Sequence, residues 1–322
     1  MNAATPHNTN PVSSGNTNAV TLNGIRKTYD KGTILAVNDV SFNVEKGELF
    51  GLIGPDGAGK STIFRILTTL LLADKGAATV AGMDVVKDFR KIRECVGYMP
   101  GRFSLYQDLT IEENLQFFAS LFGTTVEQNY DLIKDIYEQI KPFRTRRAGK
   151  LSGGMKQKLA LCCALVHKPQ VLFLDEPTTG VDAVSRKEFW EMLKRLKEQG
   201  ITILVSTPYM DEANLCERIA LMQTGQILSI DTPANIVKAY PGSLYAVKAN
   251  ALHKLLIDIR SYGEALSCNA FGDSLHVSFK NDAQDGPAKL EKFLSEKDHQ
   301  QLEIKKIDAT IEDSFIQLQA GQ

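Results

Sequence analysis

A glycine-rich stretch ending in a lysine and two hydroxyl residues, GPDGAGKST, occupies positions 54–62 of the chain. An apolar run, Leu49–Ile53, precedes it, and a helix-like segment, Ile63–Leu67, follows it. In such a loop the backbone N–H groups converge on the β-phosphate of a nucleotide, Lys60 adds a positive charge, and the Ser61 hydroxyl can hold Mg2+. Glycine is needed because a Cβ would clash with phosphate oxygens or forbid a positive φ. The residues expected to bind the nucleotide are Gly54, Pro55, Asp56, Gly57, Ala58, Gly59, Lys60, Ser61 and Thr62.

Two adjacent carboxylates, Asp175 and Glu176, follow a second apolar run, Val171–Leu174. An uninterrupted apolar run is typical of a strand that is buried on both faces of a parallel sheet. At the end of this strand Asp175 can reach Mg2+, directly or through water, and Glu176 can polarise the attacking water. Ser61 and Asp175 are therefore the candidate metal ligands, and Glu176 and Lys60 are the candidate catalytic residues. The expected cofactors are ATP and Mg2+.

A third motif, LSGGMKQ at positions 151–157, precedes a helix-like segment. Its hydroxyl and glycine N–H groups form an anion site at a helix N-terminus. The loop at 54–62 already encloses the triphosphate, so a second anion site predicts a second copy of the domain, whose nucleotide it covers. The residues expected to contact the nucleotide of that partner are Ser152, Gly153, Gly154 and Gln157.

Together these motifs give a family resemblance over about two thirds of the chain. Residues from about 20 to 235 resemble the nucleotide-binding domain of an ATP-binding cassette (ABC) transporter, with the motifs in the order of that family. The phrases LSGGMKQK and PTTGVD, the latter ending at Asp182, resemble the drug-exporting subfamily, whose permeases are separate polypeptides. The resemblance implies that Tyr29 stacks on adenine and that Asp182 lies in a loop touching the opposite subunit. By its residue type and place alone, Tyr29 reads as a half-buried tyrosine at a strand end.

The same resemblance implies the fold class, the partners and the location. The fold is an α/β P-loop NTPase of ABC type, with a RecA-like core, a small antiparallel β subdomain and a helical signature subdomain. The implied partners are membrane-embedded permease subunits and a second ABC cassette, either a different chain or a second copy. The implied location is cytoplasmic, peripheral on the inner face of the cell membrane.

The composition fits a folded, soluble chain of two domains. Its 322 residues carry 37 Lys and Arg against 38 Asp and Glu, a net charge of −1, so no field draws the protein to nucleic acid or anionic lipid. No apolar run approaches the ~18–20 residues of a membrane span. The polar start is unlike a signal peptide, so we expect no direct membrane insertion. The five cysteines are scattered, and the adjacent pair Cys162 and Cys163 is expected to fill a core as reduced thiols.

Changes in character along the chain predict three parts: a disordered tail over 1–19, the ABC nucleotide-binding domain over 20–240, and an accessory domain over 241–322. Within the second part, Thr110 and Glu113 form a capping box that opens an amphipathic helix. Three aromatic residues of this helical region could either face the permease or pack within the subdomain; they are Phe117, Phe118 and Phe122.

The accessory domain has strand, helix, strand, strand, helix and strand segments in that order, which predicts a small α+β sandwich of ferredoxin-like type. A final segment, Thr310–Leu318, resembles the closing helix of the accessory domain in drug-export ATPases. No chemistry is visible in this part, so regulation or a dimer contact is its expected role by fold analogy alone.

Three positions depart from the family pattern. Gly101 stands where the family has a glutamine that senses Mg2+ and the attacking water; Gln107, six residues on, is a possible substitute that the size of this shift disfavours. Pro208 stands where the family has a histidine that reaches the γ-phosphate, and proline offers neither a side-chain donor nor an N–H. Asp56 replaces the common asparagine; it can support the loop by local hydrogen bonds but adds a negative charge near a polyanion.

Three functions follow from these residues. The first is the ATPase subunit of an exporter, coupling MgATP hydrolysis to export by a separate permease within an asymmetric pair of cassettes. The second is a nucleotide-binding but catalytically weak structural or regulatory subunit of such a complex. The third is a soluble ABC protein acting on ribosomes or DNA, which the single cassette, the balanced charge and the absence of heptads disfavour.

Overall fold

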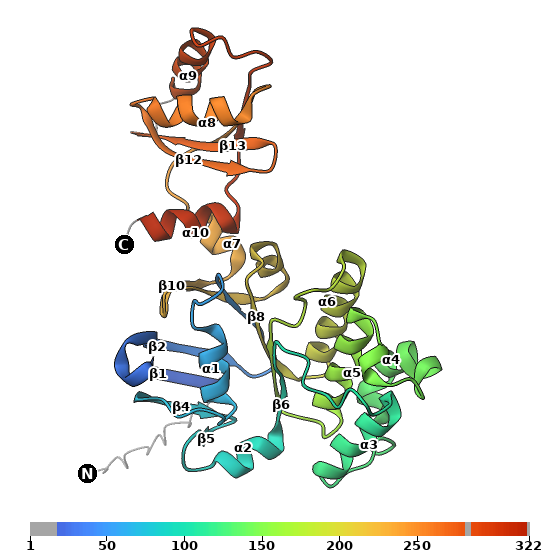
Figure 1. Ribbon diagram of the computed structural model, residues 1–322. Helices are drawn as coiled ribbons and strands as arrows, with labels where there is room; N and C mark the ends of the chain where they lie inside the picture. The colour runs from blue at the N-terminus through green and yellow to red at the C-terminus, as the bar shows by residue number, and fades with distance from the viewer. Residues whose placement is uncertain (1–17, 281–284, 321–322) are drawn as a thin grey trace, which may run out of the picture. The chain divides into compact units, whose positions relative to one another are not determined.

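The computed structural model describes residues 18–280 and 285–320, and the chain divides into two compact units, Met1–Ile230 and Asp231–Gln322 (Figure 1). Residues 1–17 of the predicted tail lie outside the described residues, whereas Asn18 and Ala19 already belong to the first strand. The sequence placed the boundary between the domains at 240, later in the chain than the division in the structure.

The first unit begins with a small antiparallel sheet in the order β2-β1-β4-β5. Its strands are β1 (Asn18–Tyr29), β2 (Ile34–Glu45), β4 (Lys75–Val80) and β5 (Met83–Asp84). Alternating residues of β1 and β2, such as Val20 and Val44, are fully buried, as the period of two requires. Phe42 of this sheet stacks on Phe50 at a centroid distance of 5.4 Å, which joins the small sheet to the large one.

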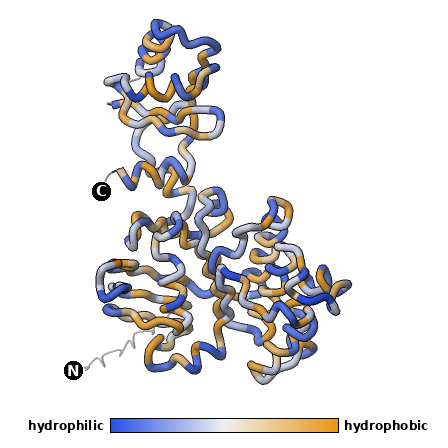
Figure 2. The backbone as a smooth tube through the Cα atoms, viewed as in Figure 1, coloured by the Kyte–Doolittle hydropathy of each residue, from blue (hydrophilic) through white to orange (hydrophobic). Residues whose placement is uncertain are grey.

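The centre of the unit is a six-stranded sheet in the order β10-β9-β3-β8-β7-β6. Its strands are β3 (Leu49–Ile53), β6 (Val96–Met99), β7 (Val171–Asp175), β8 (Thr202–Thr207), β9 (Arg218–Gln223) and β10 (Gln226–Asp231). Strands β3, β7 and β8 are buried at every position and form the hydrophobic centre of the fold (Figure 2). They pair in parallel, so their carboxyl ends, and the loops that follow, meet at one edge of the sheet.

The helices of the first unit are α1 (Lys60–Leu67), α2 (Phe89–Cys95), α3 (Ile111–Leu121), α4 (Tyr130–Ile140), α5 (Gly153–Leu165) and α6 (Ala183–Glu198). Four short 3-10 helices add Asp30–Gly32, Lys141–Phe143, Ala148–Lys150 and Met210–Leu215. The predicted capping box is present, because the Thr110 side chain accepts from the Glu113 N–H and the Glu113 carboxylate accepts from the Thr110 N–H. Cys162 and Cys163 are buried in α5, as expected of core residues.

The second unit contains α7 (Pro233–Lys238), β11 (Leu244–Lys248), α8 (Leu252–Ser261), β12 (Ala265–Phe271), β13 (Ser274–Phe279), α9 (Gly286–Ser295), β14 (Glu303–Ile307) and α10 (Ile311–Ala320). From β11 to β14 the elements follow the predicted βαββαβ order, and the antiparallel sheet has the order β12-β13-β11-β14. Ser314 of α10 donates to the Ile236 carbonyl at 3.5 Å, which ties α7 to this unit and explains the earlier boundary.

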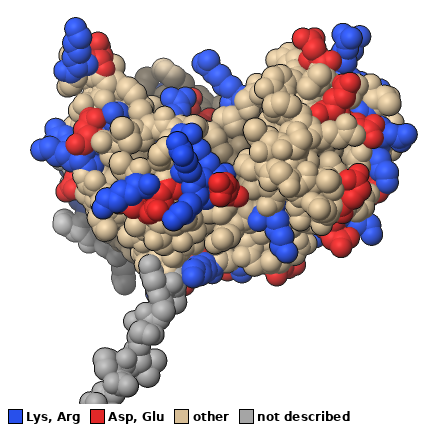
Figure 3. Space-filling view, turned by 90° about the horizontal axis from the view of Figure 1, so that it is seen from below, with Lys and Arg blue, Asp and Glu red and all other residues tan. Residues whose placement is uncertain are grey.

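Among the described residues, no helix is both long and apolar enough to cross a membrane. On the face of the first unit shown in Figure 3, basic and acidic side chains are interspersed around an uncharged, hollowed area. The surface of this face therefore carries both signs of charge side by side, as the balanced composition leads one to expect.

Candidate nucleotide site

The glycine-rich loop runs from the end of β3 to the start of α1, as the sequence predicted. Close packing leaves no room for a side chain at two of its glycines. A Cβ on Gly54 would lie 2.1 Å from the Met222 carbonyl oxygen, and a Cβ on Gly59 would lie 2.4 Å from the Ala36 carbonyl oxygen. Gly57 has a φ of +78° and faces open space, which leaves its side of the loop accessible. The loop is therefore held against β2 and β9, with an open face on which a phosphate can rest.

Lys60 begins α1 and is only 3% exposed. Its Nζ donates to the carbonyl oxygens of Gly54 at 2.8 Å and Pro55 at 3.0 Å, and it lies 3.2 Å from Glu176 Oε1. A buried ammonium needs such oxygen partners, because desolvation without them is costly. The predicted catalytic pair, from two loops far apart in the chain, is thus in contact.

Ser61, Asp175 and Ser206 form a chain of hydroxyl and carboxylate groups across three elements. Ser61 Oγ donates to Asp175 Oδ1 at 3.0 Å, and Ser206 Oγ donates to the same oxygen at 2.6 Å. Oxygen ligands of this type are those that Mg2+ prefers, and the Ser61 and Asp175 oxygens are already adjacent. These residues therefore fit a bound Mg2+, which Ser61 and Asp175 would hold.

Glu176 adopts a φ of +52°, a left-handed conformation that is uncommon for a residue with a Cβ. Its N–H donates to the Ser206 carbonyl at 3.0 Å, and Ser206 Oγ lies at the same distance from that nitrogen. Its side chain is 22% exposed and turned toward Lys60. The strained turn after β7 therefore aims the carboxylate at the loop, whereas Asp175 stays buried.

Three other predicted site residues lie around the loop. The Tyr29 hydroxyl lies 3.3 Å from Thr62 Oγ1, so the end of β1 is adjacent to the first turn of α1. Ala58 is buried, and its carbonyl accepts from the Gly225 N–H at 3.0 Å. Asp56 is exposed, and its side chain forms no hydrogen bond in the described part of the chain, so the expected local support of the loop is absent there.

The LSGGMKQ motif lies at the start of α5, as predicted. Ser152 caps this helix, because its Oγ accepts from the Met155 N–H at 3.3 Å. A Cβ on Gly154 would lie 2.7 Å from Ser185 Oγ, so the motif packs closely against α6. Gln157 is half-buried one turn further along. Among the described residues, no hydrogen bond or ion pair joins this motif to the loop at 54–62.

The loop that precedes α6 has a structural role that the sequence reasoning did not assign. Asp182 caps α6 and accepts from the N–H groups of Val184 at 3.1 Å and Ser185 at 3.0 Å. Hydrogen bonds from Ser185 are the main cause that lowers the pKa of Asp182, which keeps the cap charged. This fixed conformation places the loop next to the signature motif.

A buried carboxylate that sequence reasoning missed follows Pro208. Glu212 is 1% exposed and accepts hydrogen bonds from Thr178 Oγ1 at 2.7 Å and Thr207 Oγ1 at 2.5 Å. Arg186 Nε of α6 lies 3.6 Å from Glu212, and its guanidinium lies 4.3 Å from the centroid of the Tyr209 ring. This Glu212 cluster joins the segment after β7, the end of β8 and α6. In the sequence, the only sign of this buried carboxylate is the acidic pair at 211–212, which comes soon after a buried strand.

Gly101 lies at the edge of the site, because a Cβ there would be 3.1 Å from the Asp175 carbonyl oxygen. The side chain that the family has at this position would therefore start beside the two carboxylates. Gln107 does not replace it: its carbonyl accepts from the Gly149 N–H at 2.8 Å, and its side chain lies against Gly149 in the helical subdomain.

The loop containing Gly101 also lines a cavity of about 560 Å³ between the end of α1, α2, β6, α3 and α5. Two of the three phenylalanines named above, Phe118 and Phe122, line it, and Phe122 stacks on His167 at a centroid distance of 3.8 Å. Phe117 is 38% exposed and packs edge-on against Tyr106. None of the three is fully buried, so this part of the helical subdomain is open to a partner.

Comparisons with known proteins agree with this geometry. The family model described as ABC transporter matches residues 37–179. The doxorubicin resistance ATP-binding protein DrrA of Mycobacterium tuberculosis is 41% identical over 230 residues, covering 70% of this chain and 69% of that protein. The chain belongs to the ABC transporter family of ATP-binding proteins.

Two further matches define the extent of the likeness. The probable multidrug ABC transporter ATP-binding protein YbhF of Escherichia coli K12 is 37% identical over 306 residues, 94% of this chain. The chain spans about half the length of that relative, 52%. Among solved structures, the dimeric bacterial ABC transporter cassette MJ0796 matches with a TM-score of 0.60 and 26% identity, over 66% of this chain and 98% of that one. The last match covers nearly all of that cassette and leaves about a third of this chain outside the likeness.

Proposed function

We propose that this chain is the ATP-binding and ATP-hydrolysing subunit of an ABC exporter, which works with a separate membrane permease and a second cassette. The observation that carries the proposal is the contact of Ser61 with Asp175 and of Lys60 with Glu176, at 3.0 Å and 3.2 Å. These contacts join the phosphate loop to the strand-end carboxylates. The proposed location is peripheral, on the inner face of the cell membrane.

The residues divide the work of hydrolysis by their positions. The N–H groups of the loop and the Lys60 ammonium hold the phosphates, and Tyr29 offers its ring to adenine. Mg2+, when bound, supplies positive charge that offsets the charge of the phosphate oxygens. Glu176 accepts a hydrogen bond from the attacking water and orients it. Lys60 contacts Glu176 in this structure. When the phosphates of a bound nucleotide attract the Lys60 ammonium, the Glu176 carboxylate becomes free to accept a hydrogen bond from water.

The proposed partner surface is the cavity of about 560 Å³ lined by the loop around Gly101. Its aromatic lining suits a short helical segment of a permease, which would bury Phe118 and Phe122. The same loop approaches the Asp175 carbonyl, so a shift of the permease can reach the site through the backbone. The names of YbhF and DrrA, which refer to multidrug transport and doxorubicin resistance, support export as the direction.

The proposed complex is asymmetric. This chain offers an intact signature motif to a partner's nucleotide, but its own site lacks side chains for the γ-phosphate at Gly101 and Pro208. Loss of one preorganised donor in a hydrolytic site commonly costs about 10²–10³ in rate. The residual base Glu176 leaves slow turnover, so this site mainly holds ATP and the partner cassette together. A catalytically weak subunit is thus the second candidate, favoured by these two positions.

Two experiments test the proposal. Affinity purification of the tagged chain in mild detergent, with mass spectrometry, should recover a permease and a different cassette. The purified chain should hydrolyse ATP slowly, with little gain as its concentration rises, and Glu176→Gln should remove the residual rate. Pro208→His restores the missing donor and should raise the hydrolysis rate at least tenfold, which corresponds to an activation free energy lower by about 1.4 kcal/mol. A fast, cooperative rate in the unaltered chain would instead indicate a homodimer with two competent sites.

A further inference from the structure

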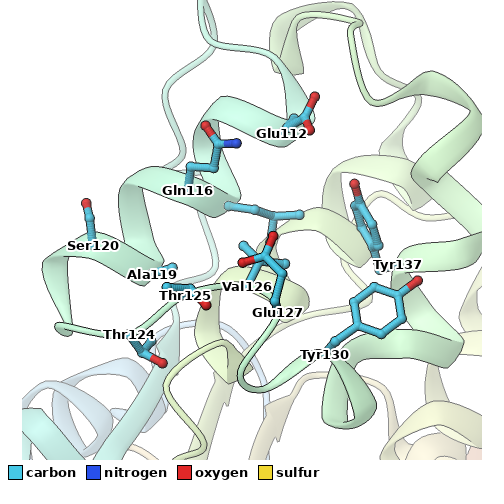
Figure 4. A pocket seen from close by; sticks show the side chains of 11 residues that line it. Glu112, Gln116, Ala119, Ser120, Thr124, Thr125, Val126, Glu127, Tyr130 and Tyr137 are labelled. Atoms are coloured by element: carbon cyan, nitrogen blue, oxygen red, sulfur yellow. The ribbon is translucent and has the colours of Figure 1, made fainter.

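A second pocket, of about 610 Å³, lies in the helical subdomain between α3, the loop that follows it and α4. Its size is within the range of small-molecule sites, about 300–1,000 Å³. None of its lining residues belongs to the nucleotide site or to the cavity proposed for the permease. The apolar residues that line it are Leu115, Ala119 and Val126, and the rest of the lining is polar side chains and two tyrosines (Figure 4).

The carboxylates of the pocket give it a negative character. Figure 4 shows Glu127 between α3 and the tyrosine rings, with Glu112 further up on α3. Glu127 forms neither an ion pair nor a side-chain hydrogen bond within the described part of the chain. Glu112 has only a long contact, 3.8 Å, with the exposed Arg144. Among the described residues that line the pocket none is basic, and the neighbouring positive charges of Lys141 and Arg144 are each paired with a carboxylate.

Tyr137 supplies a ring face and an oxygen that suit a cation, whereas Lys141 Nζ already lies over the Tyr130 ring, 5.8 Å from its centroid. Tyr130 and Tyr137 lie with ring centroids 6.1 Å apart at an interplanar angle of 83°. The Tyr130 hydroxyl is engaged, because it donates to Glu138, which also pairs with Lys141. Tyr137 is only 7% exposed, yet its hydroxyl has no hydrogen-bond partner among the described residues. The hydroxyl oxygen itself is not fully buried, so a ligand in the pocket that Tyr137 lines can reach it.

We propose that this pocket binds a small organic ammonium ion with an apolar body, through Glu127, the Tyr137 hydroxyl and the face of the Tyr137 ring. The ammonium N–H groups donate to the Glu127 carboxylate and to the Tyr137 oxygen, and the positive charge lies against a ring face. The apolar body rests on Leu115, Ala119 and Val126. An anion would meet two carboxylates, and a neutral alcohol would leave Glu127 without a counter-charge.

The test uses three probes of one shape and different charge: 2-phenylethylammonium, neutral 2-phenylethanol and anionic 3-phenylpropanoate. Binding to the full chain is measured by calorimetry and ligand-observed NMR at physiological salt. We expect 2-phenylethylammonium to bind at least about tenfold more tightly than 2-phenylethanol, because one charge-assisted hydrogen bond has that effect. The anion should not bind.

Three variants locate the site. Glu127→Gln keeps the shape but removes the charge and should weaken binding of the ammonium probe about tenfold. Tyr137→Phe removes only the hydroxyl and should weaken it about fivefold. Asp135→Asn is the matched control, because Asp135 is exposed on α4 and does not line the pocket; it should change binding less than about twofold. MgATP binding, measured on each variant, reports that the first unit is folded.

Equal affinity for the three probes, or unchanged affinity in Glu127→Gln, would overturn the proposal. An equal loss in Asp135→Asn would also overturn it, because the effect would then be one of general surface charge. Glu127 is exposed, so Glu127→Gln should fold even where Tyr137→Phe does not. None of these outcomes depends on ATP hydrolysis or on a permease.

Discussion

We expect the Glu212 cluster to contribute measurably to the free energy of unfolding of the first unit. Replacing Glu212 by Ala removes an acceptor that is 1% exposed and leaves the hydroxyls of Thr178 and Thr207 without their shared partner. Arg186 Nε, 3.6 Å away, loses its nearby negative charge. Breaking a buried pair by removal of one member costs about 3–5 kcal/mol. Glu212→Gln retains one acceptor and one donor, so it should cost less, about 1–2 kcal/mol.

Urea unfolding followed by fluorescence measures this loss in the correct unit. The chain has a single tryptophan, Trp190, which is 2% exposed in α6, so its emission reports on the first unit alone. The control is Glu188→Gln, which breaks a 2.7 Å ion pair with Lys158 on a side chain that is 49% exposed. Such a surface pair contributes less than about 1 kcal/mol.

Glu212→Ala should be the least stable, Glu212→Gln intermediate, and Glu188→Gln close to the unaltered protein. If Glu212→Ala cost no more than Glu188→Gln, the stability of the first unit would not depend on this carboxylate and its contacts with Thr178, Thr207 and Arg186, which would contradict the prediction.

Three further predictions follow from the site, the two units and the surface. Lys60→Ala should weaken MgATP binding at least about 100-fold, because the loop loses its side-chain cation; unchanged affinity in equilibrium dialysis would show the site to be misassigned. A chain ending at Tyr240 should still bind ATP, since all the motifs precede it; aggregation or loss of binding would place the accessory domain in the catalytic core. Hydrogen bonds from Lys27 and Thr28 lower the pKa of Asp74 to about 2, below its unfolded value. Its stabilising effect should therefore be complete above a pH of about 4 and vanish as the pH falls to about 2; in Asp74→Asn this acid dependence of urea unfolding should be reduced, and an unchanged dependence would contradict the assignment.

The motifs of the nucleotide site could be predicted because each depends on local backbone requirements. The glycines at 54 and 59, the apolar strands β3 and β7 and the capping box at Thr110 are visible as short patterns in the sequence. The βαββαβ order of the second unit was predicted in the same way, from alternating segments. The end of the predicted tail was wrong by two residues, because Asn18 and Ala19 pair in β1.

The contacts between distant segments were decided by the tertiary structure alone. Ser61 and Asp175 lie 114 positions apart, and they meet because parallel strands bring their carboxyl ends to one edge of the sheet. Ser206, Arg186 and Glu212 belong to the site region for the same reason, although no motif marks them. The boundary of the second unit depends on the packing of α7 against α10. The sequence by itself thus determined the phosphate loop, the carboxylates and the signature, which are local patterns, whereas side-chain partners across the fold depend on how the strands are ordered in the sheet.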